Sequence, residues 1–344
     1  VEVARKVDSS TLKAAITLYE KVERENAHTV EINNITMRYL DFGSKENTPL
    51  IWAHGSGINS YGILNVKDGL VEAGYRVIAI DYRGHGKTEV PITGFNTSLY
   101  HVADDIAALM DHLSIPKAII GGLSKGGFVA AAFYDEYPNR VMGLLLEDGG
   151  SWSDLRRQED RYLEKGTTVS TLIKNEITFF STQYKTRLAG VKALTSYYEE
   201  ITDSTFSEKE TAMLLAMLQQ HRDGTWKVGV DWEVLMLGDG KAFEKRTPSR
   251  LPIMDRSQQM MIPTVIFRNL HVPMHIIDPV SENDGFPVSY QNQILQKQHP
   301  DFVIHEIYKN TPHPAHFKRP ARFIKSAKTL LKRVNTLQYS AFEQ

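Results

Sequence analysis

The 344-residue chain contains no cysteine. This absence excludes disulfides, thiol nucleophiles and thiolate metal sites together, so any covalent chemistry must use another nucleophile. Long hydrophobic runs are also missing, because purely apolar stretches such as residues 143–146 fall far short of the roughly 18 residues of a spanning helix. The sequence therefore predicts a soluble protein without a membrane span. It leaves the compartment open, with the cytoplasm favoured over secretion.

An excess of charge of either sign is lacking as well. Lys and Arg total 40 against 41 Asp and Glu, which gives a formal net charge of −1 at pH 7. Because nucleic-acid binding depends on clustered basic charge, this balance argues against a nucleic-acid partner. The sequence has no ligand-spaced histidine cluster, P-loop or dinucleotide fingerprint, so we expect neither a metal nor a cofactor. The oligomeric state is left open.

The chain does contain an alternation of short apolar runs and helical patterns. The apolar runs are typical of strands buried on both faces of a parallel sheet, and they lie at 49–53, 75–80, 117–120, 141–146 and 272–277. A further strand is expected at 302–308. Helical spacing of apolar residues occurs at 62–73, 98–113, 124–137, 287–298 and 320–334. This alternation predicts an α/β protein with a doubly wound, mostly parallel sheet.

The rhythm is interrupted twice, and the interruptions define the expected domains. Residues 9–25 predict an amphipathic helix, within an N-terminal helical extension at 1–28. Residues 151–261 are charge-rich and include a strong helical pattern at 208–220, so we expect a mostly helical cap. The α/β core then comprises residues 29–150 and 262–344, and it begins with an antiparallel pair at 29–32 and 35–42.

A GxSxG motif, Gly122-Leu123-Ser124-Lys125-Gly126, lies between one predicted strand and one predicted helix. At such an elbow the nucleophile sits in a strained turn, and glycines two residues to either side avoid clashes while its hydroxyl projects over the strand ends. The motif predicts Ser124 as a nucleophile. The alternative is a glycine-rich turn with a helix-capping serine.

A second glycine-rich loop, His54-Gly55-Ser56-Gly57, ends the first buried parallel strand. Attack on a carbonyl group creates an oxyanion, which needs backbone N–H donors that no side chain obstructs. We assign these donors to the backbone N–H groups of Ser56 and Lys125. A tight turn that needs glycine for a positive φ is the alternative.

A serine nucleophile also needs an imidazole base, and the base needs an acid that fixes its tautomer. His313 follows the last predicted strand and is our choice of base, with His316 as its competitor. Three acids follow predicted strands, and the residues alone do not decide among them. Asp284 is favoured because its loop runs into a helix and can turn back toward the base, while Asp278 and Asp148 are the alternatives.

The order of these motifs resembles the α/β-hydrolase superfamily, and in particular its serine hydrolases with a helical cap. The resemblance covers about residues 29–150 and 262–335. It consists of the HGxG-type loop, Asp81 with a following RGHG stretch, the GxSxG elbow, a late acid loop and a late histidine. The family's last motif often continues with a histidine and a proline, as in His316 and Pro320, which favours His313 as the base. The acid loop is longer here than is usual in the family.

The resemblance implies acyl-enzyme hydrolysis by Ser124, His313 and Asp284, with a small, largely apolar ester or lactone as substrate. Trp152, Phe179, Phe180, Met213, Met217 and Trp232 are candidates for pocket walls, although most are expected in the cap core. The HGSG loop and cap also resemble carbon–carbon bond hydrolases of ring-cleavage products, whose substrate carboxylate would need an arginine such as Arg156, Arg157 or Arg187. An acyltransferase and a ligand receptor are further alternatives.

Overall fold

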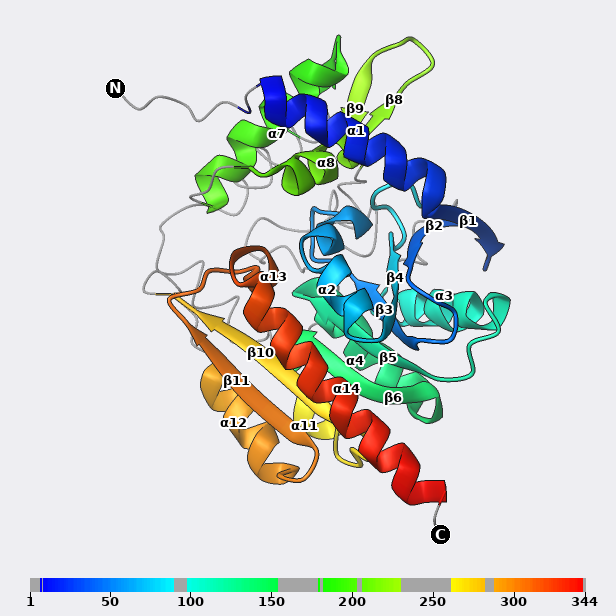
Figure 1. Cartoon of the computed structure of the whole chain (residues 1–344), viewed down its shortest axis with the longest axis vertical. Coiled ribbons are helices and arrows are strands. Elements are labelled where there is room, and N and C mark those ends of the chain that lie inside the picture. Colours follow the sequence, from blue (N-terminus) through cyan, green and yellow to red (C-terminus); the bar gives the residue numbers. More distant parts are fainter. Residues whose placement is uncertain are drawn as a thin grey trace, which may run out of the picture.

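An eight-stranded sheet forms the centre of the computed structural model (Figure 1). The structure describes residues 9–89, 98–153, 182–202, 206–229, 261–281 and 288–342, together with Val7 and Phe179. The strands of the sheet are β1 (Ala27–Ile32), β2 (Ile35–Phe42), β3 (Thr48–Ala53), β4 (Tyr75–Ile80), β5 (Ala118–Leu123), β6 (Val141–Glu147), β10 (Met274–Val280) and β11 (Val303–Lys309).

The strand order is β1-β2-β4-β3-β5-β6-β10-β11. Strand β2 pairs antiparallel with both β1 and β4, and every other pairing in the sheet is parallel. Because the parallel strands run the same way, the loops after β3, β5, β6 and β11 all leave from one edge of the sheet. This architecture confirms the predicted α/β fold and brings the predicted motifs to that edge.

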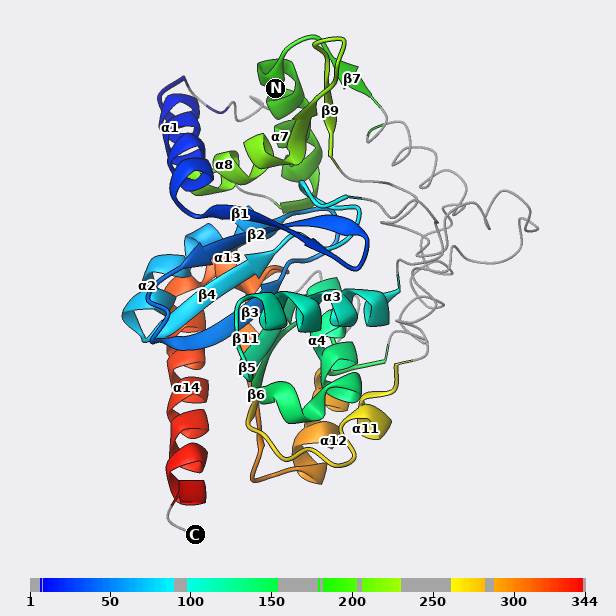
Figure 2. The same ribbon diagram turned by 90° about the vertical axis from the view of Figure 1, so that its right-hand side faces the viewer.

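Helices cover both faces of the sheet (Figure 2). The face with α3 and α4 also carries α11 and α12, whereas α2 and α14 cover the opposite face. Their bounds are α2 Lys67–Glu72, α3 Leu99–His112, α4 Lys125–Glu136, α11 Pro263–Ile266, α12 Ser289–Gln298, α13 Ala315–Lys318 and α14 Pro320–Phe342. The described connections also contain the 3₁₀ helices η1 (Ser60–Asn65) and η2 (Pro138–Arg140).

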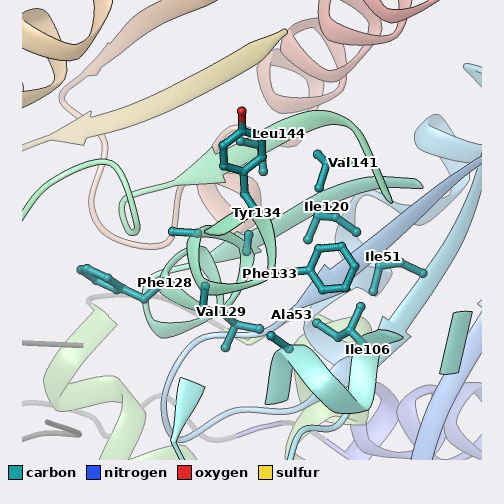
Figure 3. Packing of buried hydrophobic residues seen from close by; sticks show 14 of the residues in the cluster. Ile51, Ala53, Ile106, Ile120, Phe128, Val129, Phe133, Tyr134, Val141 and Leu144 are labelled. Carbon is teal, nitrogen blue, oxygen red and sulfur yellow. The ribbon is translucent and has the colours of Figure 1, made fainter. Parts of the chain in front are cut away.

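Alternate residues of the buried strands pack into two separate hydrophobic clusters. In β3, for example, Ile51 and Ala53 face α3 and α4, while Leu50 and Trp52 face α14. Figure 3 shows the first cluster, in which Ile51 and Ile120 lie against side chains such as Phe133 of α4. Strands buried on both faces therefore read as continuous apolar runs, as the sequence indicates.

The described part of the predicted cap contains helices α7 (Arg187–Thr202) and α8 (Glu208–Met217). It also contains a three-stranded antiparallel sheet of order β7-β9-β8, which the sequence analysis did not predict. Its strands are β7 (Gln183–Tyr184), β8 (Leu218–Gln220) and β9 (Trp226–Val228). The helix predicted at 208–220 thus ends at Met217 and continues as a strand. The domain boundaries at residues 28, 150 and 262 stay a prediction.

The predicted N-terminal helix is α1 (Ser9–Glu25), and it packs against α8 (Figure 1). Its buried residues Ala15 and Val22 join the same hydrophobic cluster as Leu214 of α8. Tyr19 stacks on Tyr61 of η1, with ring centroids 5.5 Å apart. Helix α1 therefore contacts the core and also the described part of the predicted cap, which is called the insertion below.

Candidate active site

Ser124 occupies the turn between β5 and α4, with φ 52° and ψ −117°. A positive φ is strained for a residue with a Cβ, and such strain is held only where the surroundings fix the backbone. Here the backbone N–H of Ser124 donates to the carbonyl of Glu147 at 2.8 Å, and the N–H of Gly127 donates to the carbonyl of Ser124 at 2.9 Å. The predicted elbow is thus present, with Ser124 at its apex.

The glycines of the motif are required by close backbone contacts. A Cβ on Gly126 would lie 2.0 Å from the carbonyl oxygen of Ala53, and one on Gly122 would lie 2.2 Å from the backbone of Gly126. Gly149, which follows the end of β6, has the same constraint, because a Cβ there would lie 2.0 Å from the carbonyl oxygen of Ser124. The elbow is therefore packed directly against the ends of β3 and β6.

The loop after β3 carries the predicted oxyanion donor Ser56. It lies against the elbow, since a Cβ on Gly55 would come within 3.1 Å of the Leu123 side chain. His54 is buried and stacks on Tyr82, with ring centroids 4.0 Å apart, and its Nδ1 lies 2.7 Å from the carbonyl oxygen of Gly55. Burial lowers the pKa of His54 to about 3, so this imidazole is neutral and supports the loop.

Lys125, the other predicted donor, is the first residue of α4, and its side chain is buried. Its ammonium lies over the ring of Tyr82, 5.7 Å from the centroid. Burial lowers the pKa of His54 and His85, and the charge of Lys125 lowers both further. A positive charge is therefore present beside two neutral imidazoles at this edge of the sheet.

His313 lies in the loop between β11 and α13, and its Nδ1 is 2.5 Å from the Asp148 carboxylate. Asp148 directly follows β6, has a φ of 46°, and donates its backbone N–H to the carbonyl of Ile277. The carboxylate is 4% exposed, whereas the His313 side chain is 44% exposed. A buried acid thus holds one nitrogen of an accessible imidazole.

The other two candidate acids are placed differently. Asp278 lies within β10, where it is buried and contacts His305 at 2.7 Å and Asn292 at 3.1 Å. Asp284 lies outside the described residues, so its role stays a prediction. Among the described residues, Asp148 is the candidate acid that contacts the predicted base.

His316, the competing base, is buried and bound by another acid. Its Nδ1 lies 2.6 Å from Oε2 of Glu147, and its backbone N–H donates to Oε1 of the same carboxylate at 2.9 Å. Sequence reasoning missed Glu147. The sequence pattern that matches this arrangement is a pair of adjacent acids, Glu147 and Asp148, together with two histidines three positions apart, His313 and His316. Each histidine then has an acid of its own.

The residues proposed for the pocket wall are mostly core residues. Met213 and Met217 belong to the hydrophobic cluster shared with α14, and Trp152 packs edge-on against Phe128 at 5.0 Å. Phe179 packs on the same cluster as the two methionines. The positions predicted for a wall or a carboxylate contact that lie outside the described residues are 156, 157, 180 and 232.

Arg187 is engaged away from the predicted catalytic residues. Its guanidinium lies over Tyr19 at 4.3 Å and over Trp226 at 5.1 Å, and it donates to the carbonyl of Leu215. It therefore joins α1 to the insertion. Among the described residues, no helix is long and apolar enough to cross a membrane, and no group of three or more His, Asp or Glu side chains could hold a metal ion.

Comparison with known proteins adds a family match for part of the chain. Residues 48–168 match the family model of the α/β hydrolase fold. A 2-hydroxy-6-oxononadienedioate/2-hydroxy-6-oxononatrienedioate hydrolase from Burkholderia vietnamiensis is 38% identical over 121 residues, which are 34% of this chain and 41% of the relative. The chain thus spans about two fifths of the length of this curated relative.

Solved structures match over most of the chain. The crystal structure of E-2-(acetamidomethylene)succinate hydrolase has a TM-score of 0.65 and 18% identity, and covers 89% of this chain and 98% of its own. The crystal structure of a membrane phospholipase A, described as a bacterial virulence factor, has a TM-score of 0.64 and 17% identity, and covers 95% of this chain and 92% of its own. At these identities the similarity concerns the fold.

Proposed function

This chain belongs to the α/β-hydrolase superfamily, and on that premise we propose that it is a serine hydrolase that cleaves a carboxylic ester or lactone. The observation that carries the proposal is the contact between His313 and Asp148, at the edge of the sheet where Ser124 occupies its strained turn. These are the three roles that acyl transfer by serine requires, namely nucleophile, base and an acid that orients the base.

The proposed reaction begins when Oγ of Ser124 attacks the substrate carbonyl carbon and His313 takes the hydroxyl proton on Nε2. The His313 Nδ1–H then points to Asp148, which fixes the tautomer and stabilises the imidazolium. The backbone N–H groups of Ser56 and Lys125 stabilise the oxyanion. His313 returns its proton to the departing alcohol. Water, deprotonated by His313, hydrolyses the acyl-enzyme and restores the Ser124 hydroxyl.

This assignment replaces Asp284 by Asp148 as the acid that the described geometry favours. The contact of 2.5 Å supports it, together with the low exposure of the Asp148 carboxylate. A charged hydrogen bond is strongest where water is excluded. Asp284 remains the competing prediction, and substitution of each acid distinguishes the two.

The test is hydrolysis of p-nitrophenyl acetate, butyrate and octanoate and of a set of lactones, with Ser124→Ala as the paired control. We expect measurable turnover that falls by at least about 10³-fold in Ser124→Ala, because removal of a serine nucleophile leaves only binding and oxyanion stabilisation. Equal activity of the two proteins would refute serine catalysis. Inactivity of the wild-type protein toward the whole panel would refute the ester assignment.

A second candidate function is hydrolysis of a carbon–carbon bond in a ring-cleavage product. Two observations favour it: the curated relative carries that activity in its name, and its named substrate is a dicarboxylate. The buried ammonium of Lys125 offers a positive charge for such a substrate. Loss of the dienol absorbance of 2-hydroxy-6-oxo-dienedioates, measured beside the ester panel, separates the two functions.

A further inference from the structure

We propose that Glu147 and His316 form a second histidine–carboxylate pair whose role is to position the catalytic one. This inference rests on the proposed function, because it assigns positioning residues to the same site. Neither Glu147 nor His316 would touch the substrate, since their side chains are 0% and 1% exposed.

The pair is held by two hydrogen bonds. One carboxylate oxygen of Glu147 accepts the backbone N–H of His316, and the other accepts its ring N–H at Nδ1. The ring is enclosed by aromatic side chains, with Trp52 edge-on at 5.6 Å and Phe323 at 5.5 Å. A carboxylate that binds both the main chain and the side chain of one residue fixes the position of α13, where the chain leaves the His313 loop, as well as the orientation of the ring.

Glu147 is also connected to the three proposed catalytic residues, Ser124, Asp148 and His313. Its backbone carbonyl accepts the N–H of Ser124 at 2.8 Å, and Asp148 is the next residue along the chain. His316 lies in α13, three residues after His313. The main chain of Glu147 therefore holds the nucleophile, while its side chain holds α13, the short helix that directly follows the loop carrying the base.

The energetics of burial favour a positioning role over a stabilising one. Removing two charged groups from water costs free energy that their attraction does not reliably return, so a buried ion pair is poor evidence for stability. Precise placement of the catalytic groups is the more specific benefit of this pair, because a misplacement of about 1 Å in a catalytic group can reduce the rate by about 10²-fold. The length of the Glu147 side chain is then the property that matters.

Length and charge can be separated by two substitutions. Glu147→Gln keeps the length of the side chain but removes its charge. The amide oxygen still accepts the backbone N–H of His316, and the NH₂ group can donate to Nδ1 of the ring in its other tautomer. Glu147→Asp keeps the charge but is one methylene shorter, so it cannot reach both nitrogens from the same backbone position.

The chain supplies a matched control in the pair formed by His275 of β10 and Glu306 of β11, whose side chains lie 3.1 Å apart. Glu306 also contacts Arg322 and Ser326, away from the elbow. Glu306→Asp and Glu306→Gln thus disturb a histidine–glutamate pair in the same sheet, and we expect both to keep the wild-type kcat.

The experiment measures kcat, KM and the melting temperature on an ester whose turnover depends on Ser124. We expect Glu147→Gln to stay within about threefold of wild-type kcat and Glu147→Asp to lose about tenfold or more, with KM nearly unchanged in both. Wild-type kcat in Glu147→Asp, or a greater loss in Glu147→Gln than in Glu147→Asp, would overturn the proposal. So would an equal loss of kcat in the Glu306 variants.

A second arm applies if Glu147→Asp does not fold. The side-chain amide of His316→Asn takes the place of the ring Nδ1–H, so we expect near wild-type kcat, whereas His316→Leu cannot donate and should lose about tenfold or more. Equal kcat values in these two variants would overturn the inference. If Ser124→Ala retains full turnover, it is instead the proposed function that fails.

Discussion

Lys87 Nζ donates to the carboxylate of Glu23 at 2.6 Å and so joins the loop after β4 to the N-terminal helix. The same carboxylate accepts a hydrogen bond from the Tyr61 hydroxyl at 2.7 Å and pairs with Arg38 of β2 at 2.7 Å. One half-buried side chain of α1 thus contacts three separate segments of the core, while Tyr19 in the same helix contacts Arg187 of the insertion.

We expect Glu23→Gln to destabilise the protein by about 1–3 kcal/mol near neutral pH, because hydrogen bonds to the charged carboxylate are lost. Burial by itself would raise the pKa of Glu23, but the hydrogen bonds from Lys87 and Tyr61 and the nearby cations outweigh it and hold the pKa below its ordinary 4.5. The stabilisation is therefore present above the unfolded-state pKa and is lost as the pH falls through the lower folded-state value.

Melting temperatures of the wild type and Glu23→Gln across pH check this prediction. The difference between the two should be largest near neutral pH and should close as the pH falls below 4.5 and through the lower folded-state pKa of Glu23. Glu20→Gln changes an exposed glutamate of the same helix and serves as the control. A difference that stays constant with pH would contradict the ionised pairing.

The choice between the two acids can be made by substitution. If Asp148 orients His313, Asp148→Asn should lower kcat by about 10³–10⁴-fold, because the amide favours the wrong tautomer of the imidazole. Asp284→Asn should then cost less than about tenfold. A large loss in Asp284→Asn and a small one in Asp148→Asn would return the role to Asp284.

The elbow should not tolerate even one added methyl group. Gly126→Ala would place a Cβ 2.0 Å from the carbonyl oxygen of Ala53, which is backbone and cannot turn aside. We expect a loss of about 1–3 kcal/mol of stability. We also expect at least about a 100-fold loss of kcat, because the displaced strand end leads into the oxyanion loop.

Gly62→Ala is a suitable comparison for Gly126→Ala. Its added Cβ would meet only side-chain atoms, of Ile58 and Phe317 at 3.4 Å and of Met213 at 3.7 Å. Thermal unfolding and ester hydrolysis should place this variant close to the wild type. If the two alanine variants behave alike, tight backbone packing is not what constrains the elbow.

Lys125 should determine the preference for charged substrates. Lys125→Met keeps the backbone N–H and the length of the side chain but removes the ammonium beside Tyr82. We expect kcat/KM for an ester with an anionic acyl group to fall about tenfold relative to that for its neutral analogue. Lys297→Met, which changes an exposed lysine of α12, should leave this ratio unchanged. Equal effects on both esters would rule out charge recognition by this side chain.

Most of the core could be predicted from the sequence because its strands are buried on both faces. The apolar runs at 75–80 and 141–146 became β4 and β6 within one residue, since such a run has few alternatives between two amphipathic helices. The small sheet of the insertion was missed because its strands have only two or three residues. No two-residue periodicity can be recognised over that length.

The turn at Ser124 could be predicted from the sequence, whereas the contact between His313 and Asp148 could not, for a physical reason. Ser124 lies between glycines whose spacing is itself the steric requirement of the elbow. Asp148, Asp278 and Asp284 all follow strand runs that end at one edge, and which of them meets His313 depends on side-chain direction. That direction is set locally by the φ of 46° at Asp148, which no sequence pattern encodes.

The packing of α1 against α8 joins two helices that are synthesised at different times. A ribosome makes α1 before any strand of the sheet, but α8 emerges only after strands β1 to β6 are complete. The buried face of α1, with Ala15 and Val22, stays without its partner on α8 during that interval. Helix α1 is thus made well before the helix against which it packs, and this part of its packing must wait until α8 has been synthesised.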